Sequence, residues 1–373
     1  MAEAIARGAD RAGPGFRAVL TVLHVAYPLA PVDPDAVGGV EQVLFHLEQG
    51  LAMRGCRTIV VGREDSRVCG TLIGVPIVPP PYDEATIATV RQRSAEAIRT
   101  ALEGWAIDLV HMHGFDFNTY LPPPDVPVLA TLHCPSAWYA PSALHPARRG
   151  IWLNAVSARQ NAELQPNSRL LGFVENGAPA ELFTARHARR AFALLLGRIA
   201  PDKGVREALL AARAADMPLL VAGELYPYPE HQRYFTTEIA PLLDVKRRYI
   251  GPVGFRRKRR LLAAARCVLI PSLVPETSSL VLRESFAAGT PVIAFRKGAV
   301  VDAIACGRTG FLVDTVDDMA AAMRRASELD GNACRQVARE HFSFERMVEG
   351  YLELYQRVLQ LSTATEYSRE AAL

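Results

Sequence analysis

The stretch "LLLGRIAPDKGVREALLAA", residues 194–212, contains the pattern that decides the fold. An apolar run ends at Gly197, a short polar loop follows, and a helical pattern begins near Lys203. Short and strongly apolar runs are typical of parallel strands that are buried on both faces of a sheet. The order of strand, loop and helix therefore predicts an α/β unit.

The same order recurs along the chain. The apolar runs lie at residues 18–25, 57–62, 107–113, 128–133, 153–157, 192–197, 218–223, 248–253, 267–272, 291–295 and 310–313. Between them apolar residues repeat at helical spacing, as in residues 40–51 and 205–212. Because the alternating series runs twice, we predict an α/β protein with two Rossmann-like domains that face each other across a cleft.

The domain boundary is expected in the polar stretch 175–190, whose glycine and proline are typical of a linker. One domain would then span residues 17–176 and the other residues 177–343. A last helical pattern at residues 344–361 follows the second series, and its periodicity alone allows packing on either domain.

The composition favours a soluble globular enzyme, with 50% hydrophobic and 22% charged residues. A chain of 373 residues is too long for one ordinary core. The net charge of +3 is too small by itself to indicate a nucleic acid partner. The six cysteines include no C-x-x-C pair, which argues against a zinc ribbon or a disulfide scaffold and fits a reducing cytosol.

Both chain ends, residues 1–16 and 362–373, are expected to be flexible. The first segment carries charges and no apolar core, so it does not resemble a signal peptide. No apolar run approaches the length of a membrane span. We therefore expect a cytoplasmic protein.

The loop after the strand at 192–197 is a candidate phosphate site. Free N–H groups and the helix dipole favour an anion at the start of a helix. Arg198 and Lys203 flank the loop and add two positive charges, while Gly204 allows a close approach of the backbone. The alternative is that both cations lie on the surface and that Asp202 is an ordinary N-cap.

The second candidate lies in "PSLVPETSSLVLRESFAAGTPVIAF", residues 271–295, where Glu276 and Glu284 stand eight positions apart. The hydroxyls that can cap the following helix belong to Thr277, Ser278 and Ser279. Helical side chains lean toward the amino terminus, so Glu284 can point to the cleft and accept hydrogen bonds from vicinal hydroxyls. The alternative is two unrelated glutamates, with Glu284 paired to a neighbour such as Arg283.

The first domain offers a glycine pair and three histidines. Gly38 and Gly39 precede its first helix without a dinucleotide or P-loop motif, so they permit either a ligand or a tight turn. His111, His113 and His133 end two strands. They could hold a metal, but no carboxylate-rich motif accompanies them. His133 is more interesting as a neutral donor in the cleft.

Five cations, Arg256–Arg260, precede a helical pattern, where they would oppose the helix dipole. A solvated face is the simplest interpretation. Contact with an anionic membrane surface or acceptor is the alternative.

Together these motifs resemble a retaining family-four glycosyltransferase of the GT-B fold. The resemblance covers most of the chain, from "VLHVAYPLAP" to "GRTGFLVD". Its most specific part is the ordered set "GG" (38–39), "TLH" (131–133), "GR…DKG" (197–204) and Glu-x7-Glu (276–284). Each motif alone is weak, but four in this order across two α/β domains are specific.

The resemblance implies a nucleotide-diphosphate sugar as donor substrate, bound in the cleft. Arg198 and Lys203 would clamp the diphosphate, and Glu276 would hold the sugar together with backbone N–H groups. His133 would reach across from the first domain to the sugar or phosphate. The residues assigned to donor binding are Gly38, Gly39, Gly197, Gly204, Thr277, Ser278, Ser279 and Glu284, the last of them for the ribose. The last helix would cross back onto the first domain.

The resemblance also implies the reaction: front-face attack with retention, in which the leaving phosphate takes the acceptor's proton. The two cations would neutralise the diphosphate, so neither a metal nor a cofactor is expected. The acceptor is open between a glycan, a lipid-linked molecule and a small molecule. Residues 277–279 are Thr-Ser-Ser where family members often carry Gly-Phe-Gly-like residues, which leaves donor identity open.

Four other functions compete with this interpretation. A nucleotide-sugar epimerase or a sugar phosphorylase would use a similar scaffold. A metal-dependent hydrolase would use His111, His113 and His133. An inactive protein that only binds sugar nucleotides would turn nothing over.

Overall fold

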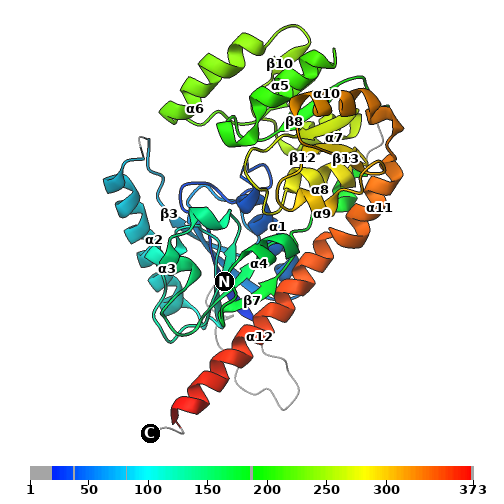
Figure 1. Ribbon diagram of the computed structural model, residues 1–373. Helices are drawn as coiled ribbons and strands as arrows, with labels where there is room; N and C mark the ends of the chain where they lie inside the picture. The colour runs from blue at the N-terminus through cyan, green and yellow to red at the C-terminus, as the bar shows by residue number, and fades with distance from the viewer. Residues whose placement is uncertain (1–18, 37, 81, 185–187, 371–373) are drawn as a thin grey trace, which may run out of the picture.

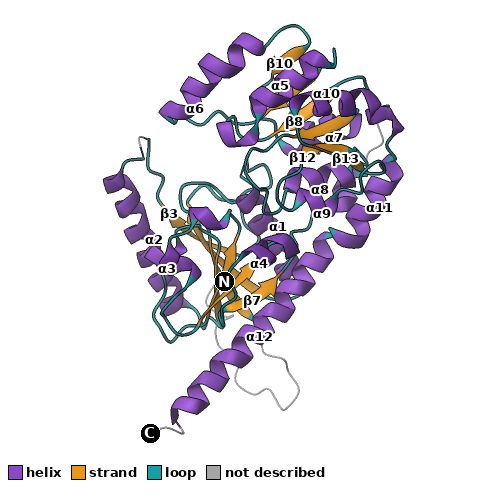
Figure 2. Ribbon diagram, viewed as in Figure 1, coloured by secondary structure: helices purple, strands orange, loops and turns teal. Residues whose placement is uncertain are grey.

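The computed structural model describes residues 19–36, 38–80, 82–184 and 188–370 (Figure 1). The expected flexible segment 1–16 lies outside the described residues, as do residues 371–373. Two parallel sheets form the centres of two α/β domains, and helices flank the strands in both (Figure 2). The predicted fold class is confirmed.

The first sheet has the order β3-β2-β1-β4-β5-β6-β7. Its strands are β1 (Thr21–Val25), β2 (Arg57–Arg63), β3 (Thr71–Val75), β4 (Leu109–Met112), β5 (Val128–Leu132), β6 (Ile151–Ala155) and β7 (Leu170–Phe173). Its helices are α1 (Gly39–Met53), α2 (Glu84–Gly104), α3 (Pro141–Leu144) and α4 (Ala158–Glu163). All strands are parallel, so their carboxyl ends lie at one edge of the sheet.

The second sheet has the order β10-β9-β8-β11-β12-β13 and is also parallel. Its strands are β8 (Ala193–Leu196), β9 (Leu219–Ala222), β10 (Arg247–Tyr249), β11 (Cys267–Ile270), β12 (Val292–Phe295) and β13 (Gly310–Val313). Its helices are α5 (Val205–Ala214), α6 (Pro229–Tyr234), α7 (Phe255–Ala264), α8 (Leu280–Ala287), α9 (Val300–Ala303), α10 (Val316–Arg325) and α11 (Gly331–His341).

Every predicted apolar run overlaps a strand, but β3 and β7 were not predicted. Both lie at the edges of the first sheet. Most of their side chains are not buried, and each strand contains a glycine, Gly74 in β3 and Gly172 in β7. Their segments, TLIGV and LLGF, are as apolar as the predicted runs, so the sequence pattern itself does not explain why they were missed.

The last helix, α12 (Phe344–Glu370), crosses from the second domain and packs on the first (Figure 1). Its residues Val348, Tyr351 and Tyr355 are fully buried and share a core with Val43 and Leu47 of α1. The helix extends beyond the expected end at Leu361. No helix among the described residues is long and apolar enough to cross a membrane.

The chain passes between the domains twice, and the two crossings lie side by side. The Ala178 N–H donates to the carbonyl of Phe342 over 2.9 Å. Arg283 of α8 secures the first crossing, because its guanidinium donates to the Asn176 carbonyl at 2.6 Å and lies 2.5 Å from Glu175. The predicted linker is therefore held to the second domain by a buried arginine.

Candidate functional site

A cleft of about 520 Å³ lies between the domains, where the carboxyl ends of strands from both sheets meet. Apart from Gly204, every predicted site residue lines it. Gly204 is needed for the conformation of the backbone instead. Its φ is +63°, and a Cβ there would overlap the Pro271 carbonyl oxygen. Only glycine adopts this conformation at low cost, so Gly204 lets the loop after β8 lie against the end of β11.

The two predicted cations reach the cleft from the loop after β8. Residues Pro201–Lys203 form a 3-10 turn, and α5 begins at Val205 rather than near Lys203. Asp202 does not cap α5, since its carboxylate pairs with Arg198 Nη2 at 3.1 Å. Both cations are about a quarter exposed, 29% for Arg198 and 26% for Lys203, which leaves their charge accessible to a ligand.

Glu276 receives two donors in the cleft wall. Lys203 Nζ lies 2.8 Å from its Oε1, and the Ser272 hydroxyl donates to the same oxygen. Burial alone would raise the pKa of Glu276, but the Lys203 charge and the two hydrogen bonds outweigh it and lower the pKa. The first glutamate is therefore ionised and bound to one of the two cations.

Glu284 pairs with Lys258, which was predicted to belong to a run of solvated cations, Arg256–Arg260. Lys258 Nζ lies 2.5 Å from Glu284 Oε1 and 3.1 Å from Gln42 Oε1 of α1, so Lys258 connects the two domains. The alternative that Glu284 pairs with Arg283 is wrong, because Arg283 binds Glu175 and the carbonyl of Asn176 in the linker. Both side chains of the Lys258–Glu284 pair are about nine-tenths buried.

The cation run Arg256–Arg260 lies inside α7, not ahead of it. Helical geometry divides the run, because Lys258 faces inward on the same side as Leu262, four positions later. Arg259 donates to the Leu182 carbonyl at 2.6 Å. The exposed cations of the run are Arg256, Arg257 and Arg260. The spacing of Lys258 and Leu262 was the signal in the sequence for an inward lysine.

The glycine pair makes room for a carboxylate that was not predicted. Glu41, in the first turn of α1, is 7% exposed and lines the cleft. A Cβ on Gly38 would overlap its Oε2, whereas one on Gly39 would only touch Leu280 of α8. Burial raises the pKa of Glu41, opposed by the charges of Arg198 and Arg63. Gly38 therefore accommodates Glu41.

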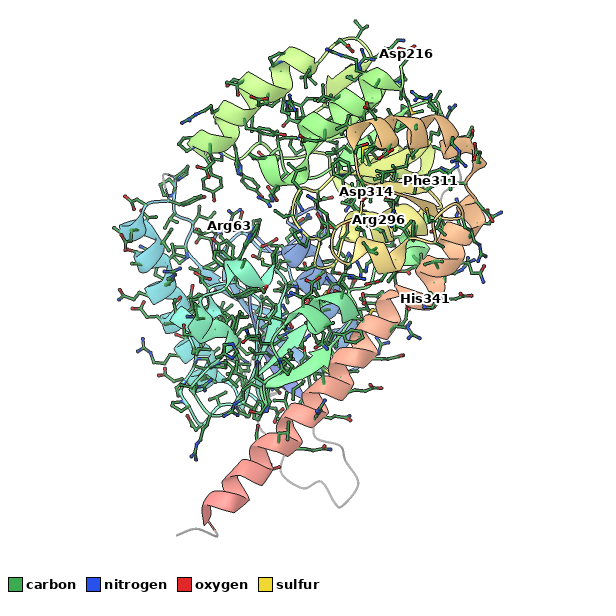
Figure 3. The ribbon with its side chains drawn as sticks, viewed as in Figure 1. Arg63, Asp216, Arg296, Phe311, Asp314 and His341 are labelled. Carbon is green, nitrogen blue, oxygen red and sulfur yellow. The ribbon has the colours of Figure 1, made fainter. Side chains whose placement is uncertain are left out.

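Arg63 stands at the rim of the cleft in the first domain, where Figure 3 labels it. It is held in place by Asp65, whose Oδ1 lies 2.6 Å from Nε. Its charge adds to the positive potential in which Glu41 lies.

The three hydroxyl residues before α8 have different roles. Ser279 caps α8, since its oxygen accepts from the Leu282 N–H at 3.4 Å. The Thr277 hydroxyl donates to the His133 carbonyl at 2.7 Å and so joins the two domains. Ser278 Oγ is buried in the cleft wall and has no hydrogen-bond partner among the described residues.

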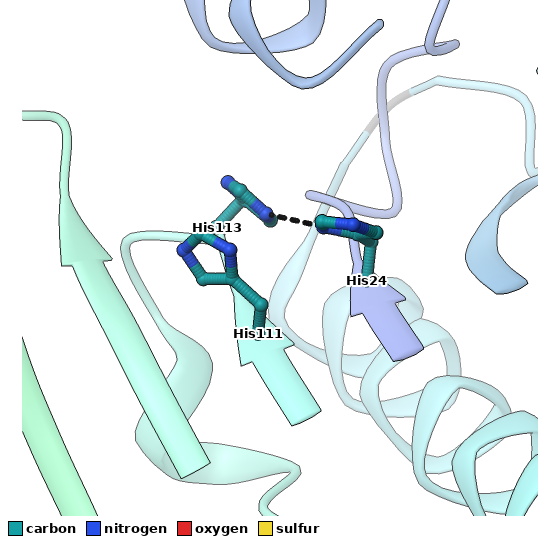
Figure 4. A group of neighbouring side chains, drawn as sticks. All are labelled: His24, His111 and His113. Carbon is teal, nitrogen blue, oxygen red and sulfur yellow. Dashed lines mark hydrogen bonds between the residues drawn. The ribbon is translucent and has the colours of Figure 1, made fainter. Parts of the chain in front are cut away.

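The predicted histidines form a cluster with a fourth, His24 of β1, and Figure 4 draws His24, His111 and His113 of this cluster. His133 Nε2 lies 3.1 Å from His113 Nδ1, and His113 Nε2 lies 3.2 Å from His24 Nδ1. The ligand nitrogens of His24, His111 and His113 lie within 4.8 Å of one another. Both nitrogens of His111 are already bound at 2.7 Å, one to Tyr355 and one to Thr131. His111, His113 and His133, for which metal binding was an alternative, are thus part of a hydrogen-bonded core.

Two family models match the two halves of the chain. Residues 37–163 match the model described as Glycosyltransferase Family 4, and residues 190–328 match the one described as Glycosyl transferases group 1. The chain belongs to the glycosyltransferases. Within this class it is 26% identical to a glycogen synthase of Mycobacterium tuberculosis strain H37Rv, over 90% of the chain and 94% of the relative.

A second relative is a D-inositol 3-phosphate glycosyltransferase of Nocardioides, 38% identical over 117 residues. That similarity covers 30% of the chain but only 25% of the relative. Among solved structures, sucrose-phosphate synthase of Thermosynechococcus elongatus has a TM-score of 0.72 at 17% identity, covering 91% of the glycosyltransferase and all of that chain (100%). Alr3699/HepE of Anabaena, solved with UDP-glucose, has a TM-score of 0.70 at 16% identity with the same coverage. These neighbours share the GT-B fold.

Proposed function

We propose that this glycosyltransferase moves a sugar from a nucleotide-diphosphate sugar to an acceptor hydroxyl, with retention of anomeric configuration and without a metal. The observation that carries the proposal is the meeting of Arg198, Lys203, Glu276 and Glu284 at one interdomain cleft. The volume of about 520 Å³ suits a ligand of this size.

The two cations are suited to a diphosphate. Arg198 and Lys203 are now bound by the carboxylates of Asp202 and Glu276. A diphosphate brings more negative charge and more acceptor oxygens than either carboxylate, so it would compete well for both cations. As the bond to the sugar breaks, charge accumulates on the leaving diphosphate, and fixed cations stabilise it there.

The two glutamates would bind the rest of the donor. Glu284 lines the cleft and pairs with Lys258, and it would accept hydrogen bonds from two ribose hydroxyls. Glu276 and the Ser278 hydroxyl, which also line the cleft, would bind the sugar. Retention needs no protein nucleophile if the leaving phosphate takes the proton of the acceptor.

The cations make a metal unnecessary for neutralising the diphosphate. We expect incubation with EDTA followed by gel filtration to leave the rate of transfer unchanged. Added Zn²⁺ or Mg²⁺ should not raise it. Recovery of a lost activity by Zn²⁺ would instead support the metal-dependent alternative.

The acceptor would enter from the first domain. Trp138 lines the cleft and is 46% exposed, and Phe115 lies there at 36%. Exposed rings of this kind suit the apolar face of a sugar, so a glycan, a lipid-linked glycan or a small glycosylated molecule is proposed as acceptor. The exposed Arg256, Arg257 and Arg260 of α7 would serve a peripheral contact with the inner face of a membrane, in a cytoplasmic location.

The experiment that tests the function is a thermal-shift panel with uridine, guanosine, adenosine and thymidine diphosphates. A ligand at 100 times its Kd stabilises the folded state by about 2.7 kcal/mol, so one base should raise the Tm by several degrees more than the others. The neighbour solved with UDP-glucose makes the uridine compound the first to test. No shift with any of the four would contradict the proposal.

Product analysis separates the rival reactions. An epimerase would convert the donor without an acceptor, and a phosphorylase would require free phosphate. We expect neither reaction, and sugar transfer only when both donor and acceptor are present.

A further inference from the structure

A chain of hydrogen-bonded imidazoles runs from the core of the first domain to the cleft. It connects His24 to His113, as Figure 4 shows, and His113 to His133, with N–N distances of 3.2 and 3.1 Å. The three residues lie on or just after the neighbouring strands β1, β4 and β5. His24 and His113 are fully buried, and His133 lines the cleft.

The rings of this chain are neutral. Burial lowers the pKa of His24 and of His133 to about 3, and it also lowers the pKa of His113 well below its usual value. Each ring therefore carries one proton, on Nδ1 or on Nε2. Which nitrogen holds it decides whether His133 offers the cleft a donor or an acceptor.

The inner end of the chain sets the direction. His24 Nε2 is buried and has no hydrogen-bond partner among the described residues. If the rings donated inward, His24 Nε2 would carry a buried N–H without an acceptor, which is among the most unfavourable arrangements of a polar group. If they donate outward, that position holds only a lone pair. The protons then lie on Nδ1 of His24, His113 and His133.

His111, beside the chain, has the opposite assignment from its own contacts. The Thr131 hydroxyl donates to Asn154 Oδ1 at 2.7 Å, so it must accept from His111 Nε2–H. His111 Nδ1 is left to accept from the Tyr355 hydroxyl of α12. The His111 ring lies against His113, with 3.9 Å between ring centroids and a tilt of 40° between the rings, and no hydrogen bond joins the two among the described residues. With its only lone pair engaged, His111 is a poor metal ligand.

We propose that His24 and His113 are positioning residues that hold His133 in its Nδ1–H form, so that a neutral N–H donor faces the cleft. What it would donate to, an oxygen of the donor sugar or of its diphosphate, rests on the proposed function. The direction of the hydrogen bonds along His24, His113 and His133 does not depend on the proposed function. A neutral donor would keep this hydrogen bond across the neutral pH range, where an ordinary histidine begins to gain or lose its charge.

The test is a long-range ¹H–¹⁵N correlation spectrum of the full chain labelled with ¹⁵N-histidine, with signals assigned by single histidine-to-asparagine variants. We expect protonated Nδ1 on His24, His113 and His133, and protonated Nε2 on His111, which is the internal control. A His133 protonated on Nε2 would overturn the proposal. So would stoichiometric Zn²⁺ that survives dialysis, because the metal would occupy the chain's nitrogens.

Two variants of His24 add a functional readout. His24→Asn keeps an amide donor for His113 Nε2 and should retain the wild-type His133 tautomer and rate. His24→Leu removes the donor, so the His133 tautomer should become mixed and kcat should fall about tenfold. Affinity for the nucleoside diphosphate should stay unchanged if His133 donates to the sugar, and should fall if it donates to the diphosphate. An unchanged tautomer in His24→Leu would contradict the proposal. If His24→Leu does not fold, the His133 tautomer in the wild-type spectrum still tests the proposal. That spectrum also tests it if the protein shows no sugar transfer.

Discussion

Replacing Arg198 by alanine is expected to lower kcat for sugar transfer by about 10²–10³-fold, the usual loss when one fixed group that stabilises transition-state charge is removed. The fold should survive, because the Arg198–Asp202 pair is partly exposed and such pairs add little stability. Steady-state kinetics and circular dichroism check the two halves of this prediction.

Lys203→Ala should lower kcat for sugar transfer by a similar factor, but it should also affect stability. It leaves the buried Glu276 carboxylate without its cation, so some stability is lost as well. Arg296→Ala is the matched control, since Arg296 is an exposed arginine of the same domain that does not line the cleft. Its rate should stay within about twofold of the wild-type rate. Near-normal turnover in both Arg198→Ala and Lys203→Ala would end the diphosphate interpretation.

Glu284→Ala is expected to weaken nucleoside diphosphate binding and to destabilise the fold by about 3–5 kcal/mol. The stability loss arises because Lys258 stays buried without its partner, which is the usual cost of breaking a buried ion pair from one side. Calorimetric titration measures the first effect and urea unfolding the second.

The double variant Lys258→Met with Glu284→Leu separates the two effects. Removing both charges restores most of the stability, because apolar residues replace a buried pair at little cost. The ribose contact is still absent, so the affinity should stay low. If Glu284→Ala binds the diphosphate as the wild type does, Glu284 has only a structural role.

The sequence was informative about the strands that are buried on both faces, because such strands need unbroken apolar runs. The edge strands β3 and β7 were missed although their segments, TLIGV and LLGF, are apolar as well, so an apolar run does not by itself distinguish a central strand from an edge strand whose side chains are mostly not buried. The starts of α1, α5 and α8 were located to within a few residues, but α7 begins at Phe255, before the cations that were expected to precede it. The local pattern could not reveal that the turn at Pro201–Lys203 delays α5 until the glycine at position 204.

The site was predictable where a residue acts through its own loop, as Arg198, Lys203 and Glu276 do. It was not predictable where partners come from distant segments. Lys258 was counted with a run of surface cations, although it pairs with Glu284 and reaches Gln42 of the other domain. His24 joins the histidine chain only because β1 lies beside β4 in the sheet.

The most direct test of the central claim compares, by calorimetry, the binding of a nucleoside diphosphate with that of its parent nucleoside. If Arg198 and Lys203 bind the diphosphate, the wild-type protein should bind the diphosphate at least ~100-fold more tightly, since charge-assisted hydrogen bonds contribute about 1.5–3 kcal/mol each. In the double variant Arg198→Ala with Lys203→Ala that difference should largely vanish. An equally large difference in both proteins would contradict the account.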